Sequence, residues 1–430
     1  MKDRVKSLYQ HFLQYPMVST DTRTDVRDTL FFALSGERFN GNKFAEAALQ
    51  KGAAFAVIDD ERFNQDERCI LVDDVLEALQ QLAALHRKMT GVHVLAITGS
   101  NGKTTTKELV AEVLQTEKII IATRGNLNNH IGVPLTLLSI TPETEIAVVE
   151  MGANHIGEIA ALCAIAQPDT GLITNIGKAH LEGFGSFEGV VSAKNELFDF
   201  LKENNGHAIV NADDELLMKL STALKHTTYG SVRAEVQGVL KAAFPFLKLE
   251  WKHKKDTQFC ETNLYGTYNF SNLMAAVAVG CFFEIQPENI KIALSAYIPR
   301  NNRSQQLKTG KNQLILDAYN ANPVSLHAAI KSFVAYDPEN PWLILGDMFE
   351  LGDDSLKEHK KIIQQLLETD FKNILLVGRD FKQLEQAGHF LYFESTQQAA
   401  RYLRDNPIEN AYILLKGSRG MQLETLLKYL

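Results

Sequence analysis

The chain of 430 residues has only four cysteines, no apolar run long enough to span a bilayer, and no excess of basic charge. The cysteines lie far apart without a Cys-x-x-Cys pair, which disfavours a disulfide framework and a zinc site and favours reduced thiols. Lysine and arginine number 44 against 52 aspartates and glutamates, a net charge of −8. This balance, without a long basic stripe, argues against nucleic-acid binding. No apolar signal core follows the N-terminus, so we expect a cytoplasmic protein without a membrane span.

The length of the chain exceeds what one hydrophobic core supports, which predicts several domains. Its 45% hydrophobic and 22% charged residues are typical of a soluble globular protein. A helix stop at Thr90-Gly91 and the polar, proline-broken segment Tyr297–Asn302 are the expected joints. We therefore expect an N-terminal domain at residues 1–90, a central domain at 91–299 and a C-terminal domain at 300–430. Nothing in the sequence demands more than a monomer.

Apolar strands alternate with helical patterns along most of the chain, which predicts an α/β fold. In the central section the alternation indicates a parallel sheet with crossover helices, and residues 232–265 favour an antiparallel extension. Beyond residue 300 the alternation restarts and is typical of a doubly wound domain. The expected strands are Thr29–Leu34, Ala54–Ile58, Val92–Thr98, Ile119–Ala122, Ile146–Glu150, Gly171–Ile176, His207–Val210, Leu314–Asp317, Trp342–Gly346, Asn373–Val377, Phe390–Phe393 and Ala411–Lys416.

The strand Val92–Thr98 ends in a glycine-bearing loop that leads into a helical pattern. Such a loop points successive backbone N–H groups at phosphate oxygens, and the helix start adds a positive dipole. Lys103 can then reach the β- and γ-phosphates, and the Thr104 hydroxyl can ligate magnesium. Ile97 stands where the full P-loop pattern has its first glycine, so the loop is short, and an ordinary strand–turn–helix corner is the alternative. The expected ATP-binding residues here are Gly99, Ser100, Asn101, Gly102, Lys103, Thr104 and Thr105.

Further polar residues follow the predicted strands, where ligands bind in open parallel sheets. Glu150 ends one strand and is well placed to hold magnesium, although a solvated strand-end acid is the alternative. His180 lies just past the tip of the next strand, where a lone histidine is more often structural or at the surface. Lys194 begins a helix with an apolar face, a place where a lysine is most often solvated.

Amides and glycines gather at three other strand ends. In Asp317–Pro323, Asn322 is able to cap the helix that follows, and Lys416–Gly420 is a candidate anion nest. Asparagines also populate turns for conformational reasons, so an amide cluster alone leaves its role open. The amides that follow a central strand, a plausible cradle for a sugar, peptide or carboxylate, are Asn126, Asn128 and Asn129.

Taken together, these segments resemble the Mur ligase family, ATP-dependent enzymes that form amide bonds in bacterial cell-wall precursor synthesis. The family's short P-loop resembles Thr98–Thr105, which accounts for the missing glycine. Within the family, the segment Asp317–Pro323 is similar to the ligases that add D-alanyl-D-alanine to UDP-N-acetylmuramoyl-tripeptide. The resemblance implies a small N-terminal UDP-binding α/β domain, a central ATPase domain and a C-terminal Rossmann-like domain. The other matching segments are Ser19–Arg23, Gly125–Asn129, Leu345–Gly352 and Lys416–Gly420.

The resemblance also implies a role for each matching residue. Lys103, His180 and Lys194 would be catalytic, and Lys194 matches a carbamylated lysine whose added carboxylate helps to hold a second magnesium ion. Relatives commonly read Asp-Gly-His where this chain has Asn40-Gly41-Asn42, which leaves the details of UDP recognition open. The implied metal ligands are Thr104, Glu150, His180 and Lys194, with further nucleotide contacts from Asn272, Arg303 and Asp317. The implied substrate-binding residues are Ser19, Thr20, Asp21 and Arg23 for UDP, Asn320 and Asn322 for the dipeptide, and Asn126, Asn128 and Asn129.

The implied reaction uses ATP to activate a peptide carboxylate as an acyl phosphate, which the amine of the dipeptide then attacks. Domain closure would complete the ATP site, because Arg303 and Asp317 lie across the second joint from the P-loop. A folylpolyglutamate synthase or a tripeptide-forming ligase of the same architecture is one alternative, which the segment Tyr319–Asn322 disfavours. A P-loop switch that ligates nothing is the other. Whether the third peptide residue is lysine or diaminopimelate stays open.

Overall fold

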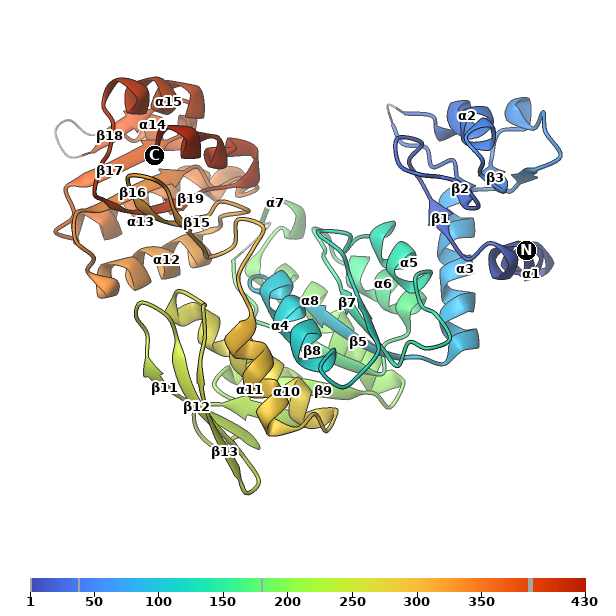
Figure 1. Ribbon diagram of the computed structural model, residues 1–430, viewed down its shortest axis with the longest axis horizontal. Coiled ribbons are helices and arrows are strands. Elements are labelled where there is room, and N and C mark those ends of the chain that lie inside the picture. Colours follow the sequence, from blue (N-terminus) through green and yellow to red (C-terminus); the bar gives the residue numbers. More distant parts are fainter. Residues whose placement is uncertain (1, 38, 179–180, 386–389) are drawn as a thin grey trace.

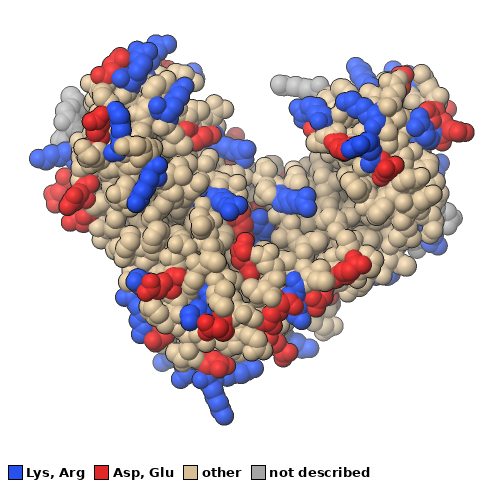
Figure 2. Space-filling view, in the orientation of Figure 1, with Lys and Arg blue, Asp and Glu red and all other residues tan. Residues whose placement is uncertain are grey.

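The computed structural model describes residues 2–37, 39–178, 181–385 and 390–430. Figure 1 shows three α/β lobes in an open arch, with the central lobe joining the N-terminal lobe (blue) to the C-terminal lobe (orange to red). Figure 2 shows this face hollowed between the two outer lobes, with Lys and Arg side chains on both lobes and at the floor of the hollow. Each lobe contains one sheet. We keep residues 1–90, 91–299 and 300–430 as the proposed domains.

The N-terminal lobe contains a four-stranded parallel sheet in the order β1-β2-β3-β4. The expected strands β2 and β3 are confirmed, whereas β1 and β4 were missed because they span only two and three residues. Helix α3 begins where the Asp74 carboxylate accepts the N–H of Glu77 and ends where Gly91 adopts a left-handed conformation with φ 64°. This confirms the helix stop at Thr90. The elements are α1 (Lys2–Gln14), β1 (Val18–Ser19), β2 (Leu30–Phe32), α2 (Ala45–Gln50), β3 (Phe55–Ile58), β4 (Cys69–Leu71) and α3 (Val75–Thr90).

The central lobe contains a nine-stranded sheet in the order β13-β12-β11-β10-β9-β8-β5-β7-β6. All neighbouring strands from β6 to β11 run parallel, and β11, β12 and β13 pair antiparallel, which confirms both the parallel sheet and its antiparallel extension. The strands are β5 (His93–Thr98), β6 (Ile120–Ala122), β7 (Ile146–Glu150), β8 (Thr170–Ile173), β9 (His207–Asn211), β10 (Lys225–Gly230), β11 (Val236–Ala242), β12 (Lys248–His253) and β13 (Asp256–Glu261). The helices are α4 (Lys103–Leu114), α5 (Gly132–Leu137), α6 (Glu158–Ala166), α7 (Leu181–Phe184), α8 (Phe187–Glu203), α9 (Glu215–Leu220), α10 (Phe270–Phe282) and α11 (Pro287–Ala296).

Two strand predictions in this lobe need correction. Strand β8 ends at Ile173 and not at Ile176, because Thr174 and Asn175 turn away to bond the loop after β5. Strand β10 was missed, since its sequence, Lys-His-Thr-Thr-Tyr-Gly, has no apolar run although its last three residues are buried.

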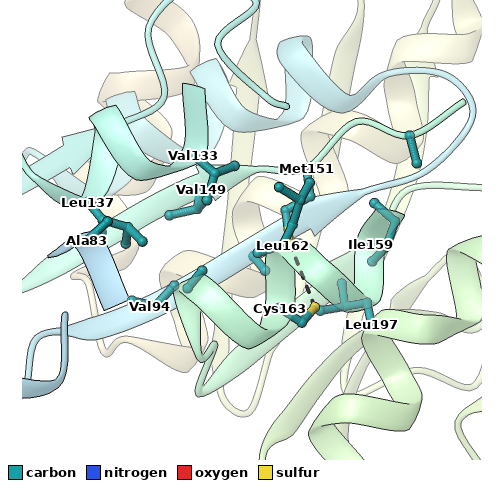
Figure 3. Packing of buried hydrophobic residues seen from close by; sticks show 14 of the residues in the cluster. Ala83, Val94, Val133, Leu137, Val149, Met151, Ile159, Leu162, Cys163 and Leu197 are labelled. Carbon is teal, nitrogen blue, oxygen red and sulfur yellow. Dashed lines mark hydrogen bonds between the residues drawn. The ribbon is translucent and has the colours of Figure 1, made fainter. Parts of the chain in front are cut away.

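One apolar core joins the first two lobes. Figure 3 shows Val94 of β5 and Val149 of β7 in the cluster that also contains Ala83 of α3. Helix α3, the longest helix of the N-terminal lobe, packs against α5 and α6 of the central lobe and so joins the two lobes. Cys163 of α6 is fully buried in this core, and burial raises the pKa of its thiol to about 12, which makes it unreactive.

The C-terminal lobe contains a six-stranded sheet in the order β14-β15-β19-β16-β17-β18, parallel except for the edge strand β14. This confirms the doubly wound prediction. Strand β14 was missed, and two 3-10 segments follow β19, η5 (Arg419–Met421) and η6 (Leu423–Tyr429). The other elements are β14 (Gln305–Lys308), β15 (Gln313–Asp317), α12 (Pro323–Tyr336), β16 (Pro341–Gly346), α13 (Ser355–Leu367), β17 (Asn373–Val377), α14 (Arg379–Gln383), β18 (Leu391–Phe393), α15 (Thr396–Asp405) and β19 (Tyr412–Lys416).

Aromatic rings join the central lobe to the C-terminal lobe. The ring of Tyr336 on α12 lies 5.3 Å from that of Phe244 and 6.1 Å from that of Tyr265, centroid to centroid. Tyr336 also contacts Tyr412 at 5.1 Å within its own lobe. These contacts hold the end of α12 and the start of β19 close to the antiparallel extension.

Candidate active site

The loop between β5 and α4 depends on two glycines. Gly99 and Gly102 have φ values of 140° and 80°, in the region that favours glycine. A side chain at Gly99 would overlap the hydroxyl of Thr174, and one at Gly102 would overlap the side-chain amide of Asn272. The short loop therefore closes tightly against β8 and α10. Its shape is that of a P-loop in spite of Ile97.

Lys103 begins α4 and folds back over this loop. Its Nζ donates to the carbonyl oxygens of Gly99 at 2.7 Å and of Ser100 at 3.3 Å. Burial lowers the pKa of Lys103, the carboxylate of Glu150 opposes that shift, and the guanidinium of Arg303 adds to it. The ammonium group therefore lies near two other charged groups, one from the central lobe and one from the C-terminal lobe.

Glu150 is 1% exposed, so it is not a solvated strand-end acid. Its Oε1 accepts hydrogen bonds from the Thr104 hydroxyl at 3.1 Å and from Nδ2 of Asn128 at 2.8 Å. Its Oε2 is buried and has no hydrogen-bond partner in the described part of the chain. A buried carboxylate oxygen without a partner is costly unless a cation or donor satisfies it. A carboxylate oxygen beside a threonine hydroxyl is the donor set that magnesium prefers, so these residues fit a magnesium ion.

Lys194 lies in the middle of α8 and not at its start as the sequence predicted, and it is 2% exposed, which excludes the alternative of a solvated lysine. Its Nζ lies 3.5 Å from the carbonyl oxygen of Ala153 and 5.3 Å from the centroid of the Phe184 ring. Burial, and then the positive charge of Lys103, lower the pKa of Lys194 to about 7. At neutral pH a substantial fraction of such a lysine is neutral, and a neutral amine is a nucleophile. His180 lies outside the described residues.

Two polar residues that the sequence did not single out support the loop. Asn175 accepts the N–H of Asn101 at 3.1 Å and donates to its carbonyl at 3.0 Å. Asn269 accepts from Nδ2 of Asn272 at 2.8 Å, and Asn272 in turn accepts from the Thr106 hydroxyl at 3.1 Å. Asn175 lies just past β8, and β8 pairs with β5, so the position of Asn175 points to the loop after β5. The sequence does not reveal that these two strands are neighbours, which only the sheet order shows.

The C-terminal lobe reaches the P-loop through Asn322. Its Oδ1 accepts the N–H of Ser325, so it caps α12 as the alternative reading holds. Its Nδ2 also donates to Oδ1 of Asn101 at 2.7 Å, across the lobe boundary. Asn322 therefore both caps α12 and contacts the P-loop.

The other predicted residues of this lobe lie near the same edge. Asp317 accepts from Nζ of Lys416 at 2.7 Å and from the N–H of Ser304 at 3.2 Å. The Arg303 guanidinium carbon lies 3.6 Å from the centroid of the Tyr319 ring. Asn320 is exposed, and its Oδ1 accepts the N–H of the next residue. The structure thus brings Arg303, Asp317 and Asn322 to one edge of the sheet.

The predicted UDP segment lies in the N-terminal lobe. Arg23 donates to both carboxylate oxygens of Asp21, with Nη2 at 2.7 Å, while its own side chain is 89% exposed. The hydrogen bond from Arg23 lowers the pKa of Asp21 to about 2. Ser19 donates its hydroxyl to the carbonyl of Asp21 at 3.2 Å.

Asn129, in the central lobe, differs from its neighbours, because it accepts the N–H groups at the start of α5 and acts as a cap.

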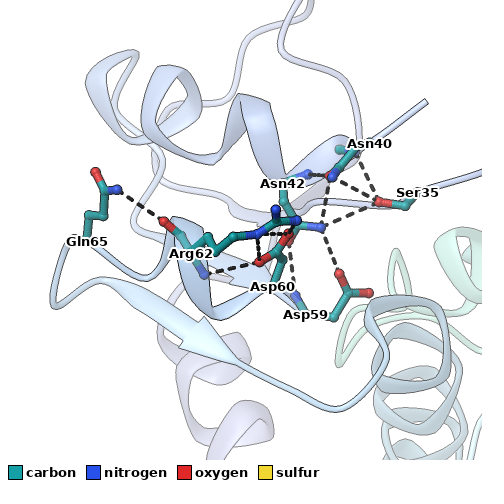
Figure 4. A network of polar contacts seen from close by, with 8 residues as sticks. Ser35, Asn40, Asn42, Asp59, Asp60, Arg62 and Gln65 are labelled. Carbon is teal, nitrogen blue, oxygen red and sulfur yellow. Dashed lines mark hydrogen bonds and ion pairs between the residues drawn. The ribbon is translucent and has the colours of Figure 1, made fainter.

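The segment that departs from the family pattern turns inward. Figure 4 shows Asn42 donating to Asp59 Oδ1, at 2.7 Å, and accepting the N–H of Asp59 at 3.0 Å. Asn42 is 2% exposed, and Asp59 Oδ2 accepts the N–H of Val75 at the start of α3. Asn40 accepts the N–H of Asn42 at 2.9 Å. In this chain Asn42 therefore ties its loop to α3 and does not face solvent.

A second candidate metal group proves to be structural. Asp347, His359 and Asp380 are the acidic and histidine side chains that come close enough to hold an ion, within the residues described. The Asp347 carboxylate already accepts two backbone N–H groups at the start of α14, and His359 Nε2 accepts the N–H of Met348 at 3.0 Å. His359 Nδ1 donates to the carbonyl of Ser355 at 2.8 Å. Since the histidine lone pair is used, this network orders the loop after β16 and leaves no position for a metal.

These features define a three-lobed α/β protein whose central lobe carries a short P-loop beside a buried carboxylate and a buried lysine. Three family models match the chain in order: the Mur ligase family, catalytic domain at residues 14–87, the Mur ligase middle domain at 97–280, and the Mur ligase, glutamate ligase domain at 302–419. The chain belongs to the Mur ligase family. The resemblance drawn from the sequence is confirmed.

Individual relatives are similar over almost their whole length. The UDP-N-acetylmuramoyl-tripeptide–D-alanyl-D-alanine ligase of Bacillus subtilis is 37% identical over 427 residues, which cover 96% of this chain and 92% of that protein. The enzyme of the same name from Haemophilus influenzae is 33% identical, covering 96% and 93%. A crystal structure of MurF from Acinetobacter baumannii is 30% identical with a TM-score of 0.88, covering 99% of this chain and 97% of that one. None of the helices in the described ranges combines the length and apolar character needed to cross a bilayer.

Proposed function

We propose that this protein is an ATP-dependent ligase that joins D-alanyl-D-alanine to UDP-N-acetylmuramoyl-tripeptide in peptidoglycan precursor synthesis. The observation that carries the proposal is the hydrogen bond from Asn322 to Asn101, which sets the segment Asp317–Pro323 against the P-loop. The ligases from Bacillus subtilis and Haemophilus influenzae bear that name at 37% and 33% identity.

The P-loop is the proposed site of the ATP phosphates. The N–H groups at the start of α4 and the Lys103 ammonium are positioned to hold the β- and γ-phosphates. Arg303 and Asp317 approach from the C-terminal lobe, and Asn272 supports the loop from α10. The N-terminal segment with Asp21 and Arg23 is the proposed receiver of the UDP end, while Asn128 donates to Glu150 at the end of β7.

Thr104 and Glu150 are the residues that would hold magnesium, with Lys194 as a further ligand once carbamylated. Carbamylation joins Nζ to the carbon of carbon dioxide and releases a proton, so it needs the neutral amine that burial favours. Bound magnesium would neutralise charge on the phosphates and so favour transfer of the terminal phosphoryl group.

The chain's own groups account for the chemistry in two steps. The peptide carboxylate attacks the γ-phosphorus, the bond to the β-phosphate oxygen breaks, and an acyl phosphate and ADP form. The amine of the dipeptide then attacks the acyl carbon, loses a proton and expels orthophosphate. Lys103 holds the transferring phosphoryl group in the first step, and the C-terminal strand ends orient the amine in the second.

The proposed function is tested by substrate dependence. ADP release by the purified protein should need both the sugar-nucleotide tripeptide and D-alanyl-D-alanine, and the product should be the pentapeptide nucleotide by mass spectrometry. ATP hydrolysis that neither substrate changes would indicate a P-loop protein that ligates nothing. Turnover with a folate and glutamate in place of these substrates would indicate a folylpolyglutamate synthase, the alternative ligase of the same architecture.

We expect the reaction to release ADP and orthophosphate, because the loop grips the β- and γ-phosphates around the group that is transferred. Phosphorus NMR of the reaction mixture would show both products in equal amounts. AMP and pyrophosphate would instead mean that the carboxylate is adenylated, and they would overturn the acyl-phosphate route.

We expect Asn320→Ala to impair use of the dipeptide more than use of ATP. Asn320 is exposed at the tip of β15, next to the residues that contact the P-loop, and its loss removes an amide without opening a core. One lost hydrogen bond should raise the KM for the dipeptide by about 3- to 10-fold. Steady-state kinetics with each substrate varied in turn checks this, and unchanged dipeptide kinetics would remove Asn320 from the acceptor site.

A further inference from the structure

Three loops meet at the carboxyl edge of the C-terminal sheet. They follow β15, β19 and β16, which are neighbours in that order, and they carry Tyr319, Arg419 and Phe349. Parallel neighbours bring their loops to one edge, where ligands of doubly wound folds bind. Asn322, from the first of these loops, touches the P-loop, so this edge faces the proposed ATP site.

Ser418 ties the three loops together. Its hydroxyl donates to the carbonyl of Ala321 at 3.4 Å and accepts the N–H of Phe349 at 2.9 Å. Its own N–H donates to the carbonyl of Asp347 at 3.1 Å. Ser418 is buried, so it holds the backbone of the next residue, Arg419, in place. The side chain of Arg419 is exposed.

An apolar wall stands beside the arginine. Phe349 is 45% exposed, unusual for a large aromatic residue, and a Cβ added at Gly420 would lie 2.6 Å from its ring. Glycine at that position therefore lets the ring lie against the Arg419 loop. Tyr319 is the second ring at this edge, with the Arg419 guanidinium carbon 5.1 Å from its centroid.

Positive charge at this edge lacks compensation. Arg303 and Arg419 both lie over the Tyr319 ring, at 3.6 and 5.1 Å. Within the described ranges neither guanidinium has a carboxylate at ion-pair distance, and Arg303 Nε is buried without a hydrogen-bond partner. Asp317, the acid nearest to Arg303 along the chain, is already paired with Lys416. Two like charges close together favour an anion, and a guanidinium binds a carboxylate or phosphate in a bidentate manner.

We propose that Arg419 binds the C-terminal carboxylate of the acceptor dipeptide, with Phe349 and Tyr319 as the wall for its methyl groups. The inference rests on the proposed function and names the part of the site that selects the acceptor. D-Alanyl-D-alanine carries one free carboxylate and two methyl groups, which match one arginine and two rings. A phosphate oxygen of the nucleotide offers similar chemistry, so the test must separate these two anions.

The test pairs a change in the protein with a change in the dipeptide. KM and kcat are measured for D-alanyl-D-alanine and for its C-terminal amide, with wild-type protein and with Arg419→Gln. The wild type should use the amide with a KM about 10- to 100-fold higher, because a charge-assisted hydrogen bond is lost. Arg419→Gln should raise the KM for the free dipeptide by a similar factor. It should leave the KM values for the amide and for ATP unchanged.

Arg379→Gln is the matched control. Arg379 follows β17 at the same edge, is exposed, and lies 3.8 Å from Glu394, so its loss should leave the preference for the free dipeptide intact. Arg419→Lys should keep part of that preference because it keeps the charge.

Two results would overturn the assignment of Arg419. An Arg419→Gln protein with a raised KM for ATP would make Arg419 a phosphate ligand, and equal losses with dipeptide and amide would make it structural. A wild type that releases no ADP in response to any dipeptide would refute the proposed function itself, and the carboxylate anchor with it.

Discussion

Lys194→Ala should lose most of its ligase activity, with kcat lower by about 100- to 1,000-fold, the usual cost of removing a group that stabilises transition-state charge. The substitution removes the amine that carbon dioxide would convert into an anionic metal ligand. Millimolar formate or acetate should restore part of the activity, because a small carboxylic acid can occupy the space that the missing Lys194 side chain leaves. The measurement is ADP release with and without the added acid.

Lys202→Ala is the control for this experiment, since Lys202 lies on the same helix but is exposed. Lys103→Ala should be inactive and should not respond to acids, because the group it lacks is a cation. The neutral amine of Lys194 becomes more abundant as the pH rises through about 7, so activation by bicarbonate should be stronger at pH 8 than at pH 6. Near-normal turnover of Lys194→Ala would show that the lysine only packs against Phe184 and Ala153.

Glu150→Gln should weaken magnesium binding and lower activity by about 100-fold at low magnesium, with partial recovery at high magnesium. Glutamine keeps the size of the side chain, and its oxygen can still accept from Thr104 or Asn128, but it removes the negative charge. The buried Oε2, which has no partner in the described chain, would become a neutral amide. Calorimetric titration of magnesium into the protein with ADP measures the effect without relying on turnover.

Glu145→Gln provides the comparison, because Glu145 is exposed just before the opposite end of the same strand. It should bind magnesium as the wild type does. A Glu150→Gln protein with unchanged magnesium affinity would leave Glu150 as a support for Thr104 and Asn128 alone.

Patterns carried by neighbouring residues predicted much of this structure. The strand β5, the loop after it and the helix α4 follow from an apolar run, two glycines and a lysine within 12 residues of one another, so local preference decides them. The stop of α3 at Gly91 and the cap of α12 at Asn322 are local in the same sense. Short polar strands such as β10 and β14 were missed, because their pairing with neighbours, and not their own composition, makes them strands.

The sequence by itself thus determined the α/β alternation, the P-loop and the family, since each depends on contiguous residues. Only the tertiary structure decided that Lys194 is buried near Lys103, because the sequence around a helical lysine does not reveal which distant segments pack against its side chain. Only the tertiary structure joined Asn322 to Asn101, 221 positions away, and turned Asn42 inward to Asp59. The physical reason is the same in all three cases. Burial and hydrogen-bond partners depend on which distant segments the fold brings together, and a side chain's chemistry follows from those neighbours.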